Sequence, residues 1–300
     1  MRLPYFLVYV AIWFAGCITQ AVHAQVIPAP DQGKLLATSG VSQVEGAGGG
    51  GLVPWAVITG YGSEDSYGFN AHVTQLNTQD YQLNTYGMAL GLCDKLELSL
   101  SKQEFSGSLA PLNKLKLSQE IVGVKLKLSG DLVADQDSWQ PQIAVGAMFK
   151  RDQGITGLDA FSVNQVTQLG AKSNQGTDYY LSATKLFLAQ SLILNGTLRL
   201  TKANQMGLLG FGGDLQNHYQ VMGEASAAYL LNRKLAVGVE YRQKPNNLSV
   251  DHEKAYYDGF VAWFPNKNVS VTLAYVDLGD ITVFNPKDQH GWYLSVQIGN

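Results

Sequence analysis

The residues best suited to acid–base chemistry are three histidines that stand near carboxylates in polar segments. They occur in "NHYQ", "VDHEK" and "KDQHG", as His218, His252 and His290, with Asp251, Glu253 and Asp288 close by. A carboxylate can orient a histidine that acts as a general base. However, no serine stands in the strand–turn–helix setting of a hydrolase nucleophile, and the spacing matches no metal-ligand motif. We therefore expect no catalytic residue, no metal and no cofactor.

A second chemical candidate is the glycine-rich stretch "VEGAGGGGLVPW" at 44–55. A phosphate-binding loop needs Lys followed by Ser or Thr directly after its glycines, and then a helix. Here Leu52, Val53 and Pro54 follow, and the next segment has the pattern of a strand. The sequence therefore favours a structural role for the glycines. They are Gly46, Gly48, Gly49, Gly50 and Gly51.

The N-terminus has the parts of a secretory signal peptide. Arg2 supplies a positive charge, residues 5–18 form a short apolar run, and small residues precede a cleavage site between Ala24 and Gln25. The sequence "FAGC" at 14–17 offers a weaker alternative, lipidation of Cys17. Cleavage after Ala24 leaves one cysteine, Cys93, and therefore no internal disulfide.

Period-two alternation of apolar and polar residues recurs along the rest of the chain and predicts strands. In "KLAVGVEYRQK" at 234–244, for example, every second residue is apolar and large. Each such segment has about ten residues, the length that a tilted strand needs to cross a bilayer, whereas strands of soluble sandwiches are usually shorter. We expect thirteen strands, at 52–62, 67–77, 82–93, 95–105, 118–130, 139–150, 177–188, 191–202, 218–230, 234–244, 255–264, 268–278 and 290–299.

The predicted connections alternate between shorter and longer from the third strand onward. Outer-membrane barrels have short periplasmic turns and long outer loops, and bacterial single-chain barrels have an even number of strands. Residues 34–44 must then add one more strand or thread the lumen. The sequence thus predicts an all-β, antiparallel up-and-down transmembrane barrel of about 14 strands, with 12 possible, over residues 34–300. A signal peptide at 1–24 and a periplasmic segment at 25–33 precede it.

The requirement for an even number of strands also bears on the position of the glycine stretch. If the strand at 52–62 descends from the outside, residues 45–54 form the first outer hairpin connection; otherwise they belong to a segment inside the lumen. Two aromatic belts are expected where a barrel meets the interfaces. Trp55 and Trp292 fall at predicted outer ends, and Trp139 and Trp263 fall near predicted periplasmic ends.

Charged residues lie repeatedly opposite the apolar face of the predicted strands. They are Glu97, Lys125, Lys127, Arg199, Glu224, Glu240 and Arg242. A charge facing lipid at mid-depth costs about 2–4 kcal/mol, so these side chains should line the lumen. We expect Arg242 and Arg199 to lie between Glu224 and Glu240, and Glu97 to pair with Lys127 near the periplasmic end. Because both signs are present, the charges can line an open pore or close the lumen by pairing.

The assembled segments resemble a bacterial family known as domain of unknown function 3034. The resembling stretches include "GKLLATSGVSQVEGAGGGGLVPWAVITGYG", "ASAAYLLNRKLAVGVEYRQKPNNL" and "GWYLSVQIG". Together the resembling stretches cover nearly all of the mature chain. The resemblance implies an envelope protein of barrel type and no known activity.

Composition limits the partners. The formal net charge is -3 and no basic block appears, so we expect no nucleic-acid partner. We expect contact with outer-membrane lipid and lipopolysaccharide, with the barrel-assembly machinery, and with an unidentified small solute, in the outer membrane of a Gram-negative bacterium. The expected function is a channel or uptake protein. A closed structural or surface-display barrel and an outer-membrane hydrolase are the alternatives.

Overall fold

The computed structural model describes residues 40–60, 66–108, 112–133, 135, 138–158, 162–251, 253–283, 285 and 287–300. The signal-peptide prediction, with its cleavage site at Ala24 and Gln25, and the predicted periplasmic segment 25–33 lie outside the described residues. Among the described residues, no helix is both long enough and apolar enough to cross a bilayer.

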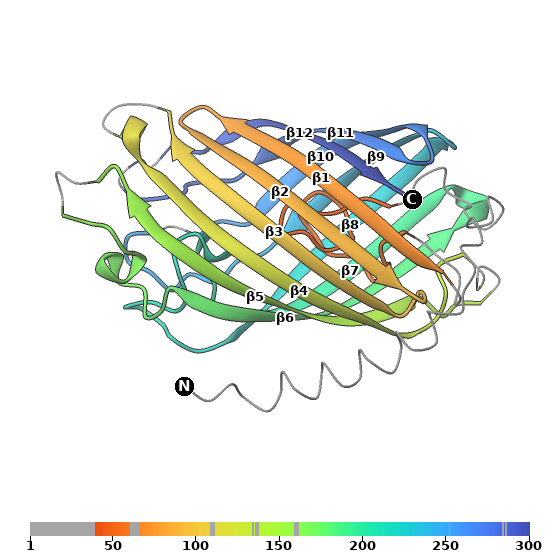
Figure 1. The fold of residues 1–300 in the computed structure, drawn as a ribbon, viewed down its shortest axis with the longest axis horizontal. Helices are drawn as coiled ribbons and strands as arrows, with labels where there is room; N and C mark the ends of the chain where they lie inside the picture. Colours follow the sequence, from red (N-terminus) through yellow and green to blue (C-terminus); the bar gives the residue numbers. More distant parts are fainter. Residues whose placement is uncertain are drawn as a thin grey trace, which may run out of the picture. The chain divides into compact units, whose positions relative to one another are not determined.

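The described residues form twelve strands. They are β1 (Tyr67–Thr78), β2 (Tyr81–Leu92), β3 (Leu96–Gly107), β4 (Lys116–Ser129), β5 (Gln142–Thr156), β6 (Gln175–Phe187), β7 (Leu192–Thr201), β8 (Gln220–Asn232), β9 (Leu235–Arg242), β10 (Tyr256–Asn266), β11 (Val269–Asp277) and β12 (His290–Gly299). Each strand pairs with its sequence neighbours, and β1 pairs antiparallel with β12, so the sheet closes into a barrel (Figure 1). Short 3-10 turns lie at Leu112–Lys114 (η1), Val166–Leu169 (η3), Leu188–Gln190 (η4) and Gln205–Gly207 (η5).

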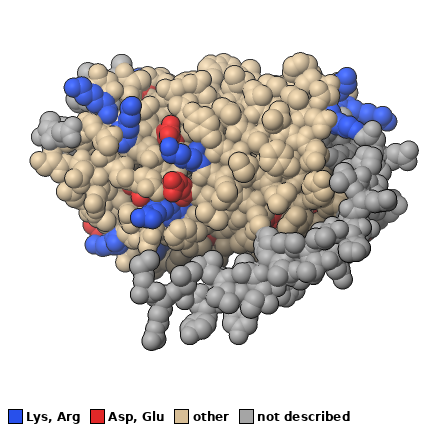
Figure 2. All heavy atoms as spheres, in the orientation of Figure 1, with Lys and Arg blue, Asp and Glu red and all other residues tan. Residues whose placement is uncertain are grey.

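The outer surface of the wall is apolar at mid-height. Large side chains such as Leu100, Val122, Leu198, Val239 and Val296 are exposed there, because every second residue of each strand points away from the lumen. On the face shown in Figure 2, charged residues gather toward the two ends. A closed antiparallel wall with an apolar outer band and a polar interior is the architecture of an outer-membrane β-barrel.

The connections distinguish the two ends of the barrel. Short turns at 93–95 and 233–234 lie at the end where β12 finishes, since the start of β1 is paired with both the end of β2 and the end of β12. Longer loops at 157–174, 202–219, 243–255 and 278–289 lie at the other end, with two exceptions to the pattern: the short turn at 79–80 also lies at this end, and the longer connection at 130–141 lies at the first end. We call the end with long loops the outer end, following the rule for such barrels.

The expected strand at 52–62 is wrong, and the barrel has twelve strands rather than fourteen. Leu52, Val53, Trp55, Val57 and Ile58 are all buried, with relative exposures of 0–7%. A wall strand must expose every second side chain to lipid, and a segment buried on all sides cannot do so. The sequence offered residues 34–44 as a further strand. Residues 40–44 belong to the same buried segment as 52–58, and residues 34–39 lie outside the described part.

The tryptophans also divide into exposed residues of the wall and one buried residue of the segment 40–60. Trp139, Trp263 and Trp292 are exposed, as residues of interfacial belts should be. Trp55 is not at an outer interface, because its ring is buried and its Nε1 donates to Ser226 Oγ of β8 at 3.1 Å.

Candidate functional site

Residues 40–60, which we call the plug, fold back on themselves inside the barrel (Figure 1, orange-red). Hydrogen bonds within the segment hold its shape. Val44 N donates to Gly51 O at 2.9 Å, and Gly49 N donates to Val41 O at 2.8 Å. The plug begins near the periplasmic end of β1, where Asn70 Nδ2 donates to Gly40 O, and it returns to that end. The lumen is therefore occupied.

The glycines allow the plug to pack tightly against the wall. Gly46 has a φ of 101°, which other residues rarely adopt. A Cβ on Gly50 would overlap the carboxylate of Glu240 in β9. The expectation that residues 45–54 form an outer hairpin connection is wrong, because the glycines lie inside the lumen, which was the other position that the sequence allowed.

Glu45 of the plug lies at the centre of a buried group of charges that we call the central ion cluster. Its members are Glu45, Lys150 of β5, Asp178 of β6, Arg199 of β7, Glu224 of β8 and Arg242 of β9. All six side chains are at most 3% exposed. Three acids face three bases, and Glu45 supplies the acid that makes the cluster neutral.

The distances show how Glu45 joins three strands of the wall that are not adjacent to one another. Its carboxylate accepts from Arg242 Nη1 at 2.7 Å, forms an ion pair with Lys150, and lies 3.4 Å from Arg199 Nη2. Within the wall, Arg199 Nε donates to Glu224 at 2.5 Å, and Lys150 lies 2.6 Å from Asp178. A single plug residue thus contacts the cations of three strands.

The seven charges named from sequence divide into four groups. Arg199, Glu224 and Arg242 meet in the cluster, and Glu224 and Arg242 stand directly opposite each other in register. Glu240 lies apart, where its carboxylate accepts from Leu52 N at 2.6 Å and from Ser226 Oγ at 2.8 Å. Arg242 therefore lies between Glu224 and Glu45, not between Glu224 and Glu240.

Glu97 and Lys125 form a second attachment nearer the periplasmic end, 3.1 Å apart. Glu97 accepts from the amides of Gly48 and Thr59 at 2.9 Å, and Lys125 donates to Gly48 O at 2.7 Å. The expected pairing of Glu97 with Lys127 is wrong, because Lys125 is the residue opposite Glu97 in register. Lys127 instead pairs with Asp94 in the short β2–β3 turn.

Sequence reasoning missed Glu45, Lys150 and Asp178. Lys150 and Asp178 occupy inward phases of their strands, so the alternation that found Arg199 could have found them. Nothing local marks Glu45, since its partners are more than a hundred residues away along the chain.

Above the plug, two outer loops are joined by a polar group that we call the outer cap, made of Gln205, Lys244, Asp251 and Glu253. Gln205 donates to Asp251 Oδ1 at 2.6 Å and accepts from Lys244 at 3.0 Å. Lys244 pairs with Glu253 at 2.5 Å. Burial, and next the negative charge of Glu253, raises the pKa of Asp251 to about 9. Asp251 is therefore protonated at neutral pH.

The histidines of the sequence do not assemble a site among the described residues. His252 lies outside them, and Asp251 and Glu253 belong to the outer cap. His290 Nδ1 lies 3.5 Å from Asp277, while Asp288 accepts from Lys254 at 2.8 Å. Within the described part of the chain, no group of three His, Cys, Asp or Glu side chains is placed to hold a metal ion.

The fold and the occupied lumen define an outer-membrane β-barrel with an internal plug. The chain belongs to the family described as protein of unknown function (DUF3034), whose model matches residues 38–297. A search of curated proteins finds no match.

Solved structures with a similar fold include porins and an enzyme. The NanC porin is 9% identical, with a TM-score of 0.50, and the match covers 77% of this chain and 98% of that one. The KdgM porin is 10% identical, with a TM-score of 0.44 and coverage of 76% and 98%. Outer membrane phospholipase A from Escherichia coli is 8% identical, with a TM-score of 0.38 and coverage of 77% and 92%. At these identities the likeness concerns the fold alone.

Proposed function

We propose that the protein is an outer-membrane uptake barrel for small solutes, in which the plug opens and closes the passage. The observation that carries this proposal is the position of Glu45. This one plug residue neutralises a wall that otherwise holds three cations against two acids at mid-lumen. Loss of that contact would release the plug and leave a charged, hydrated path.

The wall does not depend on the plug for closure. The ladder between β1 and β12 runs from Asn70↔Gly299 to Thr78↔Gly291 without any plug residue. The plug is attached by side chains such as Glu97, Lys125 and Glu240, and its main chain adds no strand to the sheet. Displacement of the plug would therefore leave the barrel intact. A barrel of twelve strands is wider than the eight-stranded kind that wall side chains can fill.

Conductance in planar bilayers tests the proposal. We expect the wild type to show brief step openings and Glu45→Gln to open at least about tenfold more often, because a neutral amide loses charge-assisted bonds of roughly 1.5–3 kcal/mol each. The conductance of each opening should stay the same. Deletion of 40–60 should give permanently open pores, which also shows that the assay detects an empty lumen.

Glu104→Gln is the matched control. Glu104 lies on the outside of β3, 2.6 Å from Lys102, and does not touch the plug. Its openings should match those of the wild type. If neither wild type nor Glu45→Gln conducts while the deletion does, the protein is a closed structural barrel and the proposal is wrong.

A further inference from the structure

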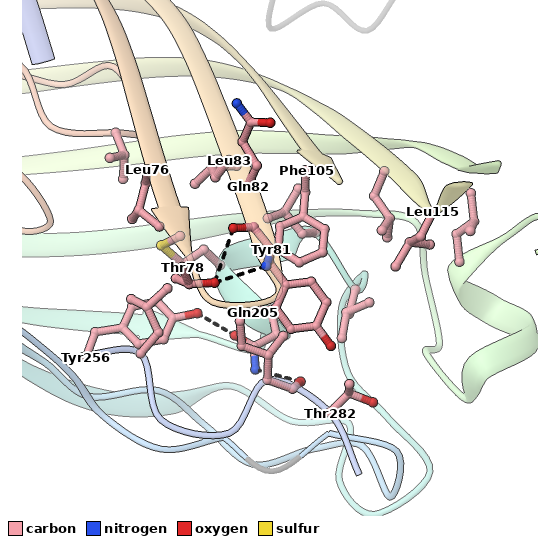
Figure 3. A pocket seen from close by; sticks show the side chains of 18 of the residues that line it. Leu76, Thr78, Tyr81, Gln82, Leu83, Phe105, Leu115, Gln205, Tyr256 and Thr282 are labelled. Carbon is pink, nitrogen blue, oxygen red and sulfur yellow. Dashed lines mark hydrogen bonds between the residues drawn. The ribbon is translucent and has the colours of Figure 1, made fainter. Parts of the chain in front are cut away.

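An apolar cavity of about 120 Å³ lies between the plug, the outer halves of β1–β5 and the outer loops (Figure 3). Leu76, Leu83, Phe105 and Leu117 come from the wall, and Met206 and Ile281 come from the loops. Its volume is close to the roughly 150 Å³ of an engineered apolar cavity that binds benzene. The space is therefore sufficient for a small aromatic or alkyl group.

Most polar side chains at the edge of the cavity already have hydrogen-bond partners in the protein. Thr78 Oγ1 donates to Gln289, and Thr282 Oγ1 donates to Val250 O. Both polar atoms of Gln205 are used in the outer cap, and Tyr256 donates to Gln205 (Figure 3). A ligand with a hydroxyl or a charge would be desolvated there and would have to displace one of these bonds, which costs about 1–3 kcal/mol.

The floor of the cavity is the plug itself. Val44 and Leu52 line it, and Val44 immediately precedes Glu45. Leu52 lies between two attachments of the plug, since its N donates to Glu240 and its O accepts from Arg242 at 3.1 Å. A molecule in the cavity would thus contact the plug in its seated position and would lose those contacts if the plug left.

We propose that this cavity is a binding site for one small, uncharged hydrocarbon-like molecule, of the alkylbenzene or short alkane class, and that its occupation stabilises the plug in its closed position. The second part rests on the proposed gating function. The first part does not, because binding requires only the cavity.

Binding is tested in nanodiscs with two probes of similar shape, 4-fluorotoluene and 4-fluorophenol, followed by fluorine NMR. Empty nanodiscs give the uptake by lipid, which rises linearly and is subtracted. We expect one saturable site per barrel for 4-fluorotoluene and an affinity at least about tenfold weaker for 4-fluorophenol, whose hydroxyl loses its bonds to water on entering an apolar cavity. Absence of a saturable site, or equal affinity for both probes, overturns the proposal.

Substitutions in the lining locate the site. Leu117→Phe and Leu83→Phe fill the cavity and should weaken 4-fluorotoluene binding at least about tenfold. Leu117→Ala enlarges it and should strengthen binding of the longer 4-fluorobutylbenzene, so the test does not depend on variants that tolerate overpacking. Leu100→Phe is the matched control on the lipid face, where the leucine is 52% exposed, and should bind as the wild type. If binding is unchanged in all three lining variants, the assignment of the site to this cavity is contradicted.

The coupling to the plug is read separately, from the conductance of the wild type with 4-fluorotoluene present. Less frequent openings support it, more frequent openings contradict it, and Leu117→Phe should abolish the decrease. Saturable binding with unchanged openings refutes the coupling but leaves the site. Gating by Glu45→Gln without any binding refutes the site but leaves the proposed function.

Discussion

The two levels of the lumen use opposite chemistry around one plug. At mid-height, six buried charges are satisfied by one another, and Glu45 is the plug's contribution. Directly beside it, Val44 and Leu52 face a cavity formed almost wholly of hydrocarbon. Separating paired buried charges is costly, because each charge is left without a partner in a site that excludes water, whereas apolar contacts are non-directional. The comparison indicates that the ionic level fixes the plug and the apolar level is suited to receive a ligand.

Among substitutions in the central ion cluster, Glu45→Ala should destabilise the protein most. It leaves Lys150, Arg199 and Arg242 with two acids in a buried site, and breaking such a group costs about 3–5 kcal/mol. We expect that loss in the free energy of unfolding, measured by urea titration in lipid. The exposed pair Lys102–Glu104 provides the control, since Glu104→Ala should change stability by less than about 1 kcal/mol. Equal effects would show that the cluster does not hold the plug.

Arg242→Ala, also in the central ion cluster, should destabilise the protein less. It removes the bond to Glu45 at 2.7 Å, but Arg199 still contacts both Glu45 and Glu224. We expect a loss of about 1.5–3 kcal/mol and a shift of ion selectivity toward cations in open pores, because one positive charge leaves the lumen. Tyr241→Leu, on the outward face of the same strand, should change neither property by much. A silent Arg242→Ala would contradict the arrangement.

Gly50→Ala tests how closely the plug must approach the wall. The new methyl would overlap Glu240, so the plug must shift at a cost of about 1–3 kcal/mol, with more frequent openings in bilayers. Gly196→Ala provides the comparison, because a Cβ there meets nothing within 4 Å. If both substitutions behave alike in unfolding and conductance, close packing of the glycines is not what positions the plug.

The last test concerns the pH response of the outer cap, which lies in the loops and not in the lumen. Because the pKa of Asp251 is raised to about 9, the folded barrel binds a proton that the unfolded chain releases at acidic pH. Its contribution to stability is full at low pH and is lost as the pH rises through about 9. Melting temperature should therefore fall between pH 5 and pH 9. Asp251→Asn should flatten that fall, and an unchanged slope would assign it to other groups.

Much of the wall could be predicted from sequence. Twelve of the thirteen proposed strands, from 67–77 onward, match β1 to β12 within three residues at each end, except that β5 extends six residues beyond its predicted end. Alternation identifies them because a residue on a wall strand faces either lipid or the lumen, and neighbouring residues must differ. The same rule placed Arg199, Glu224 and Arg242 on one side of the wall, and strand register then placed Glu224 opposite Arg242.

Only the tertiary structure decided what fills the barrel. Residues 52–58 are apolar, and the sequence predicts a strand over 52–62, yet these residues are buried on all sides against side chains of distant strands. The contacts that hold the plug join Glu45 to Lys150 and to Arg242, positions 105 and 197 residues away. The alternation of polar and apolar residues predicts whether a side chain faces lipid or the lumen, since that depends on its immediate neighbours along the strand. Which partner meets that face depends on how the closed wall brings remote strands around one segment, and no short stretch of sequence contains that information.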